Sequence, residues 1–196
     1  MKKLLFVNGC VRGKTNSRTY MLCNKFLTAY RESHSDTEIE QLDLADMPLT
    51  WLNAKDLAAR DALLSDGRLD DSGFNLARQF ADADRILVGA PFWDLSVPAV
   101  VKVYFELVSV CNITFAYTEH GQEGRCNAGK MLLITTAGGP MGEEDCACGY
   151  LKALCNMYGI GSFEAITAEG LDIWGAPVQE LLDEAAGQAT ALAASW

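Results

Sequence analysis

Short runs of consecutive apolar residues alternate along the chain with longer segments of helical periodicity. Continuous runs of this kind predict strands that are buried on both faces, and they lie at residues 4–7, 85–89, 130–136 and 163–167. A weaker strand is expected at residues 37–42, where Ile39 is the only strongly β-forming apolar residue.

Helices are expected between these strands, because apolar residues recur there at steps of three and four. The first helix places on one face Tyr20, Cys23, Phe26, Leu27 and Tyr30, and others are expected at residues 75–83, 97–110, 145–158 and 177–194. Residues 43–71 form the least regular part, with a short helix near 54–64. Strands alternating with helices predict an α/β fold, namely a flavodoxin-like, doubly wound, five-stranded parallel sheet with helices on both faces.

The composition indicates one acidic globular domain over residues 1–196. Hydrophobic residues make up 49% of the chain and charged residues 21%, and 16 Lys+Arg against 26 Asp+Glu give a net charge of −10. This charge is opposite to the basic footprint of nucleic-acid-binding proteins, and no apolar run approaches the ~20 residues that span a bilayer. We therefore expect neither a nucleic-acid partner nor a membrane partner.

The seven cysteines are odd in number and scattered along the chain, which is typical of reduced thiols in a cytoplasmic protein. The first apolar run is also too short for a secretion signal. Cys146 and Cys148 do not have the spacing of metal ligands, so no metal site is predicted. We interpret this pair as structural thiols, with a redox or sensor role as the alternative.

Three unusual loops follow the strands at 4–7, 85–89 and 130–136. The carboxyl ends of parallel strands share one edge of the sheet, where ligands bind in this architecture. The first loop carries Gly9, Gly13, Thr15 and Ser17 just before a helix, an arrangement that suits a phosphate, although the hydroxyls would equally serve as helix caps. Its glycines do not have the spacing of a Walker A loop or of a dinucleotide-binding loop.

The other two loops suit the remaining parts of a planar ligand. After residue 89, two prolines and the aromatic pair Phe92–Trp93 form a rigid apolar wall for a ring system, unless they pack as ordinary core. After residue 136, Gly138 and Gly139 allow backbone N–H groups to approach a polar ligand edge, unless they form a plain turn.

The helix at residues 97–110 is apolar nearly all round, with Lys102, Glu106 and Ser109 on one narrow side. One apolar face must cover the sheet, and the second requires another partner. We expect a homodimer through this helix. The alternative is that residues 43–71 of the same chain cover it.

At these loops the sequence resembles the flavodoxin-like NAD(P)H:quinone oxidoreductases, and most closely the FMN-dependent NADH-azoreductases. The resemblance covers nearly the whole chain, and its most specific stretches are residues 90–94, 102–108, 115–121, 129–130 and 136–139. It implies non-covalent FMN, NADH or NADPH as electron donor, and a homodimer with active sites at the subunit interface. The implied reaction is a ping-pong transfer of hydride through the flavin to a quinone, azo compound or similar small acceptor.

The resemblance also implies roles for individual residues. The FMN phosphate would be held by Thr15, Asn16 and Ser17, with Cys10 in the same loop. The isoalloxazine and ribityl chain would be bordered by Pro91, Phe92, Trp93 and Asp94, and the pyrimidine edge by Thr136, Ala137, Gly138 and Gly139. Tyr117 would line the pocket over the flavin as the catalytic residue.

Some positions depart from the family pattern. Gly9–Cys10 stands where a hydroxyl residue is usual, Ala137 where Arg is common, and Trp93–Asp94 where azoreductases usually have Tyr-Asn. We expect a lowered pKa for the Cys10 thiol, because it lies at a helix start. His120 is interpreted as a surface histidine rather than as a proton donor.

Two alternative functions remain. A flavodoxin-like electron carrier shares the fold and would suit the acidic surface. A redox-responsive binding protein would use Cys146 and Cys148.

Overall fold

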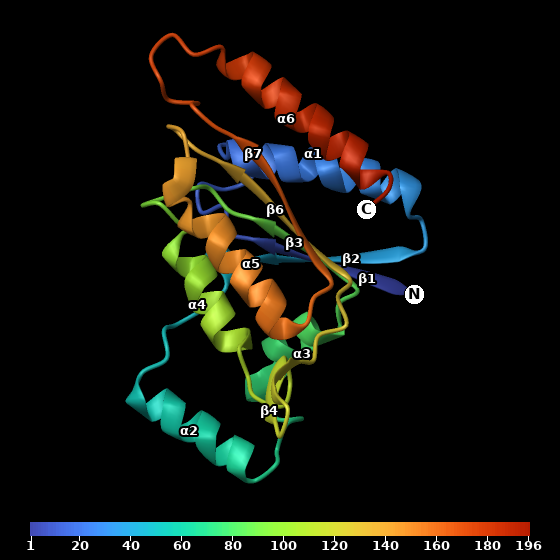
Figure 1. Ribbon diagram of the computed structural model, residues 1–196, viewed down its shortest axis with the longest axis vertical. Helices are drawn as coiled ribbons and strands as arrows, with labels where there is room; N and C mark the ends of the chain where they lie inside the picture. Colours follow the sequence, from blue (N-terminus) through green and yellow to red (C-terminus); the bar gives the residue numbers. More distant parts are fainter.

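The computed structural model describes residues 1–196 and contains the predicted parallel sheet. Its five strands lie in the order β2-β1-β3-β6-β7, which is a doubly wound, flavodoxin-like topology with helices on both faces (Figure 1). The strands are β1 (Lys2–Asn8), β2 (Thr37–Asp43), β3 (Arg85–Gly89), β6 (Lys130–Thr136) and β7 (Ser162–Ala168).

Alternate residues of the central strands serve two separate cores. In β1, Leu4 and Phe6 pack on one side of the sheet, whereas Leu5 and Val7 pack on the other. The first side is covered by α1 (Arg18–Ser33) and α6 (Val178–Ala193), and the second by α3 (Asn75–Asp82), α4 (Ala99–Val108) and α5 (Cys146–Tyr158) (Figure 1). Because both faces are covered, the consecutive middle positions of such a strand are apolar, as in Leu4–Val7 of β1.

The predicted elements are confirmed to within two residues at their ends. The strands at 85–89 and 130–136 have the predicted bounds. The helix expected at 97–110 is shorter and begins at Ala99, because Pro98 disfavours helical backbone at Val97. None of the helices has the length and apolar character needed to cross a membrane.

An antiparallel hairpin outside the main sheet was missed. It consists of β4 (Phe115–Thr118) and β5 (Gly121–Gly124). The second strand has the sequence Gly-Gln-Glu-Gly and is fully exposed, so neither β propensity nor alternation marks it.

Helix α2 (Ala54–Ser65) stands away from the rest of the chain (Figure 1). It begins with a capping box, in which Asn53 accepts hydrogen bonds from the backbone N–H groups of Lys55 and Asp56 and the Asp56 side chain accepts one from the Asn53 N–H. None of its residues is buried. Only its last turn packs on the rest of the chain, through Leu63 and Leu64 against Phe74, Ala77 and Val110. The cap therefore stabilises a helix that has few apolar partners within the chain.

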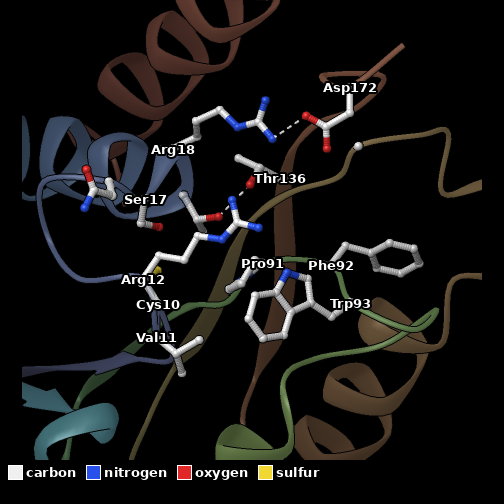
Figure 2. A pocket seen from close by; sticks show the side chains of 13 residues that line it. Cys10, Val11, Arg12, Ser17, Arg18, Pro91, Phe92, Trp93, Thr136 and Asp172 are labelled. Atoms are coloured by element: carbon white, nitrogen blue, oxygen red, sulfur yellow. Dashed lines mark hydrogen bonds and ion pairs between the residues drawn. The ribbon is translucent and has the colours of Figure 1, made fainter.

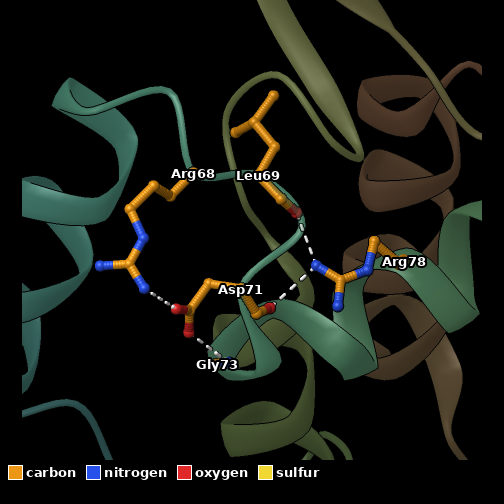
Figure 3. A network of polar contacts seen from close by, with 5 residues as sticks. All are labelled: Arg68, Leu69, Asp71, Gly73 and Arg78. Atoms are coloured by element: carbon orange, nitrogen blue, oxygen red, sulfur yellow. Dashed lines mark hydrogen bonds and ion pairs between the residues drawn. The ribbon is translucent and has the colours of Figure 1, made fainter.

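The segment between α2 and α3 is fixed by a polar network (Figure 3). Arg78 of α3 donates to the backbone carbonyls of Leu69 and Asp71. The Asp71 carboxylate accepts from Arg68 at 2.6 Å and from the Gly73 N–H at 3.0 Å. This network holds one end of α2 in place.

The register of the sheet brings the three predicted loops together. Asn8 pairs with Gly89, and Gly89 pairs with Ile134, two residues before β6 ends. The chain therefore leaves β1, β3 and β6 at the same edge, where the candidate site lies.

The hairpin packs backbone against backbone at Gly124. A Cβ atom there would lie 2.0 Å from the Gly159 nitrogen and 2.1 Å from the Tyr158 carbonyl carbon. We expect Gly124→Ala to lower the free energy of unfolding by about 2 kcal/mol or more, because the backbone must shift. Gly187→Ala is the matched control. It lies in α6 with open space around it and should raise stability by about 0.5–1 kcal/mol. Urea unfolding of both variants checks this, and equal stability of the two would contradict the packing described.

Candidate functional site

A pocket lies at the carboxyl edge of β1, β3 and β6 (Figure 2). It collects residues of all three predicted loops and of the loop after β7. The predicted site residues that line it are Cys10, Asn16, Ser17, Pro91, Phe92, Trp93, Thr136 and Gly138. The lining residues that were not predicted are Val11, Arg12, Arg18, Thr19 and Asp172.

The other predicted site residues lie near this pocket or away from it. Thr15 lines an adjacent depression with Asn16 and Ser17. Ala137 is buried and donates its N–H to Ala168, and Asp94 and Gly139 belong to the predicted loops without lining the pocket. Tyr117 lies on the β4–β5 hairpin with its side chain 75% exposed and lines no part of the pocket.

One end of the pocket is built from the start of α1. Ser17 caps this helix by accepting a hydrogen bond from the Tyr20 N–H at 3.1 Å. The N–H groups of Asn16, Ser17, Arg18 and Thr19 donate no hydrogen bond within the protein. Free amides at a helix start, together with the helix dipole, bind anions such as phosphate.

A buried hydrogen bond joins the first and third loops beneath the pocket. The hydroxyls of Thr19 and Thr136 lie 2.6 Å apart, and both residues are buried. This contact fixes the start of α1 against the end of β6. The phosphate loop and the glycine loop are therefore joined to each other beneath the pocket.

The expected lowering of the Cys10 pKa is wrong. Burial raises the pKa of the Cys10 thiol to about 11, and its hydrogen bond with Ser17 only partly offsets this effect. The sulfur lies against the Gly89 carbonyl, 3.7 Å away. Its burial outweighs the helix-start effect, so this thiol is protonated and unreactive at neutral pH.

The aromatic wall is held by a tight turn. Trp93 and Ser96 exchange two backbone hydrogen bonds, of 2.9 and 2.8 Å, around Asp94 and Leu95. These two residues have φ values of 49° and 65°, so the turn is of type I′, which favours glycine or asparagine. The Leu95 carbonyl also accepts from the Cys146 N–H at 3.0 Å, which ties the turn to α5.

The far end of the pocket offers a second set of free donors. The N–H groups of Gly138 and Gly139 make no hydrogen bond within the protein, while their carbonyls accept from Asp172 and Gly170. A Cβ atom on Gly138 would lie 2.4 Å from the Asp172 carboxylate. A side chain here would therefore displace the Asp172 carboxylate, whereas glycine leaves both the carboxylate and the N–H in place.

Arg18 and Asp172 form an ion pair that no sequence pattern indicated. The guanidinium lies 2.9 Å from the Asp172 carboxylate and also donates to the Leu171 carbonyl at 3.1 Å. The two residues are 154 positions apart. Arg12, in contrast, could have been predicted, because it is a basic residue inside the predicted phosphate loop.

The remaining candidate groups lie outside the pocket. His120 is exposed and 3.5 Å from Glu119, as expected for a surface histidine. Burial raises the pKa of Cys148 to about 12, and Asp145 raises it further, whereas Cys146 is exposed. No group of three or more potential ligand side chains is arranged to hold a metal ion.

The donor set fits a phosphorylated, planar cofactor such as FMN. Free amides lie at the phosphate end, Phe92 and Trp93 provide a flat apolar border, and Gly138 with its free N–H lines the opposite end, followed by Gly139 with a second free N–H. These are the features that a phosphate, a ring system and a polar pyrimidine edge require.

Comparisons with known proteins agree with this geometry. A sequence model of the flavodoxin-like fold family matches residues 2–193. The FMN-dependent NADH:quinone oxidoreductase of Clostridium perfringens (strain ATCC 13124) is 33% identical over 195 residues, 98% of each chain. The protein of the same name from Clostridium beijerinckii is 32% identical over 191 residues, 96% of each chain.

Solved structures show the same fold. An azoreductase from Bacillus anthracis str. Sterne superposes with a TM-score of 0.89 at 24% identity over 100% of both chains. An FMN-dependent NADH-azoreductase from Bacillus anthracis str. Ames Ancestor, solved in complex with FMN, has a TM-score of 0.87 at 22% identity, over 100% of this chain and 99% of that one.

The turn at Asp94–Leu95 predicts a stabilising substitution. A left-handed conformation costs an L residue such as Leu95 about 1–2 kcal/mol, whereas glycine adopts it freely. We expect Leu95→Gly to raise the free energy of unfolding by about 1 kcal/mol over Leu95→Ala, which removes the same exposed side chain but keeps the Cβ. Chemical denaturation of the two variants measures the difference. Equal stabilities would show that the turn is not strained.

Proposed function

The chain belongs to the flavodoxin-like fold family, and from this membership and its pocket we propose that it is an FMN-dependent oxidoreductase that passes hydride from NADH to a quinone or azo acceptor. The observation that carries the proposal is the pair of free donor sets at opposite ends of one aromatic wall. The amides at the start of α1 suit a phosphate, and those of Gly138 and Gly139 suit a polar ring edge. Its relatives over nearly their whole length are named FMN-dependent NADH:quinone oxidoreductases.

The protein's part in the reaction is to bind, orient and polarise. When bound, the flavin supplies the hydride acceptor and donor chemistry. The α1 amides would hold the phosphate, and Phe92 and Trp93 would orient the ring against their flat surface. The N–H groups of Gly138 and Gly139 would stabilise negative charge on the pyrimidine edge, as donors of an oxyanion hole do.

We also propose a ping-pong order. Pro91, Phe92 and Trp93 border one side of the pocket. NADH and the electron acceptor would each need to contact the flavin held there, so one would leave before the other binds. No side-chain acid or base is needed in the pocket for this order.

The two alternatives have less support. A cysteine-based mechanism needs a reactive thiolate, but burial raises the pKa of Cys148 to about 12. An electron carrier of the flavodoxin type needs no covered substrate cleft. The unburied α2 and the groove beside α4 favour a dimer with such a cleft instead.

We propose that a second copy of the chain covers this groove. It lies between α2 and α4, is about 420 Å³ in volume, and is lined by apolar side chains that include Leu52, Leu57 and Phe105. Within the chain, α4 packs against α3, the short helix at Leu44–Asp46 and α5, whose Tyr150 and Leu154 also line the groove. In the dimer the exposed Tyr117 of one subunit would reach the pocket of the other, which accounts for its distance from its own.

We also place the protein in the cytoplasm, as one domain over residues 1–196. All seven cysteines are free thiols, and Cys10, Cys23 and Cys155 are buried. Reduced, unpaired cysteines are typical of proteins in a reducing compartment.

The proposed function predicts the spectrum of the purified protein. After incubation with FMN and gel filtration, it should keep flavin absorbance, which anaerobic NADH bleaches to the two-electron reduced form and a quinone restores. Gly138→Ala should weaken FMN binding, because its Cβ displaces Asp172. Gly187→Ala, on the outer side of α6, is the matched control and should behave as wild type. A wild-type protein that remains colourless, or a stable one-electron semiquinone, would contradict the proposal.

The proposed dimer predicts the effect of a charge in the groove. Light scattering should show a dimer of the 21.3 kDa chain, and Leu57→Glu should shift it to the monomer, because a carboxylate would be buried at the contact. NADH oxidation should fall with it, since Tyr117 then reaches no pocket. Met21→Glu places the same charge at a similarly exposed position on α1 and should stay dimeric. A wild-type monomer would contradict this arrangement.

A further inference from the structure

Three basic side chains surround the phosphate end of the pocket: Arg12, Lys14 and Arg18. A phosphate dianion that is bound by helix-start amides is held more strongly where a cation is also free to pair with it. The contacts of each side chain show which one is free.

Lys14 is committed to a carboxylate outside the pocket. Its ammonium lies 2.8 Å from Asp43, and this hydrogen bond raises the pKa of Lys14. Burial opposes ionisation of Asp43, but bonds from Lys14, Asn8 and Gln41 outweigh it and lower the pKa of Asp43. Lys14 does not line the pocket.

Arg18 lines the pocket but is also committed. Its two terminal nitrogens bind the Leu171 carbonyl and the Asp172 carboxylate, and Asp172 in turn donates its N–H to the Gly138 carbonyl. Arg18 thus holds the loop after β7 against the glycine loop. The Asp172 carboxylate beside it cancels its charge.

Most donors in the first half of the phosphate loop already have partners. The N–H of Cys10 binds the Asn8 side chain, that of Val11 binds the Gly9 carbonyl, and that of Gly13 binds the Cys10 carbonyl. The Cys10 thiol lies against the Gly89 carbonyl. This half of the loop therefore offers a bound anion mainly the backbone N–H and the side chain of Arg12.

Arg12 has no hydrogen bond or ion pair to its guanidinium, and it lines the pocket together with Asn16, Ser17 and Thr136. Figure 2 shows its side chain extended across the pocket. With Arg18 and Asp172 neutralising each other, it is the one uncompensated charge of the lining.

We propose that Arg12 is the phosphate-recognition residue of this pocket and makes it select phosphorylated flavin over riboflavin. This inference rests on the proposed function, since it concerns the same flavin site. The planar guanidinium binds two phosphate oxygens at once, which a hydroxyl or a single amide does not do. Riboflavin has the same ring and ribityl chain but no phosphate, so it loses the contact with Arg12 together with those of the α1 amides.

The test compares the dissociation constants of FMN and riboflavin by quenching of flavin fluorescence in the full-length protein. Arg12→Gln should weaken FMN binding by about tenfold and leave riboflavin binding unchanged, so the ratio of the two constants falls about tenfold. It should also reduce the salt dependence of FMN binding. Lys14→Gln removes one charge from the same loop and should keep the wild-type ratio. Because the Arg12 side chain makes no hydrogen bond or ion pair within the protein, the Arg12→Gln variant should unfold at the same denaturant concentration as the wild type.

The outcomes separate this inference from the proposed function. A wild-type ratio in Arg12→Gln, with FMN bound tightly by the wild type, overturns the role of Arg12 and leaves the flavin enzyme standing. If the ratio falls in Lys14→Gln instead, Lys14 is the residue that binds the phosphate, and this result also overturns the role of Arg12. A wild-type protein that binds neither flavin overturns both.

Discussion

The backbone pairing of β1, β3 and β6 is the constraint on which the site depends. Parallel register places Asn8 beside Gly89 and Gly89 beside Ile134, so three chain segments far apart in sequence leave the sheet at one edge. The buried bond between Thr19 and Thr136 then fixes the start of α1 to the end of β6. Two sets of unbonded N–H groups, one from a helix start and one from a glycine loop, face one pocket only because of this pairing.

Local patterns along the chain were sufficient to predict the fold and the pocket's general composition. Buried parallel strands and amphipathic helices have strong periodicity, and their order limits the topology to few choices. The loops after β1, β3 and β6 were therefore expected at one edge, and residues such as Ser17, Trp93 and Gly138 do line the pocket there. The features that were not predicted correctly depend on contacts between residues far apart in the sequence. The Arg18–Asp172 pair spans 154 positions, and the Cys10 pKa follows from burial under β3 rather than from its place before a helix.

Function and stability make opposite demands on the loops of this pocket. Leu95 adopts a left-handed conformation that glycine would hold at lower cost, in a turn that supports the aromatic wall. Gly138 lacks a side chain at a place where a Cβ would strike Asp172, and the bare backbone leaves its N–H open. The amides at the pocket ends have no protein partner, so they are available to a bound molecule. The bare backbone at Gly138 and the tight turn at Leu95 thus serve the pocket rather than the stability of the chain.

The same reasoning applies to charge. The chain carries a net charge of −10, which repels an anionic cofactor at long range, so the local field of the pocket must overcome it. Two of the three nearby positive charges do not attract the cofactor, because Lys14 is paired with Asp43 and Arg18 with Asp172. These pairs instead fix the loops that shape the pocket. Two ion pairs therefore hold the loops, and one unpaired arginine is left to recognise the ligand. The three basic residues that serve these two purposes lie within residues 12–18.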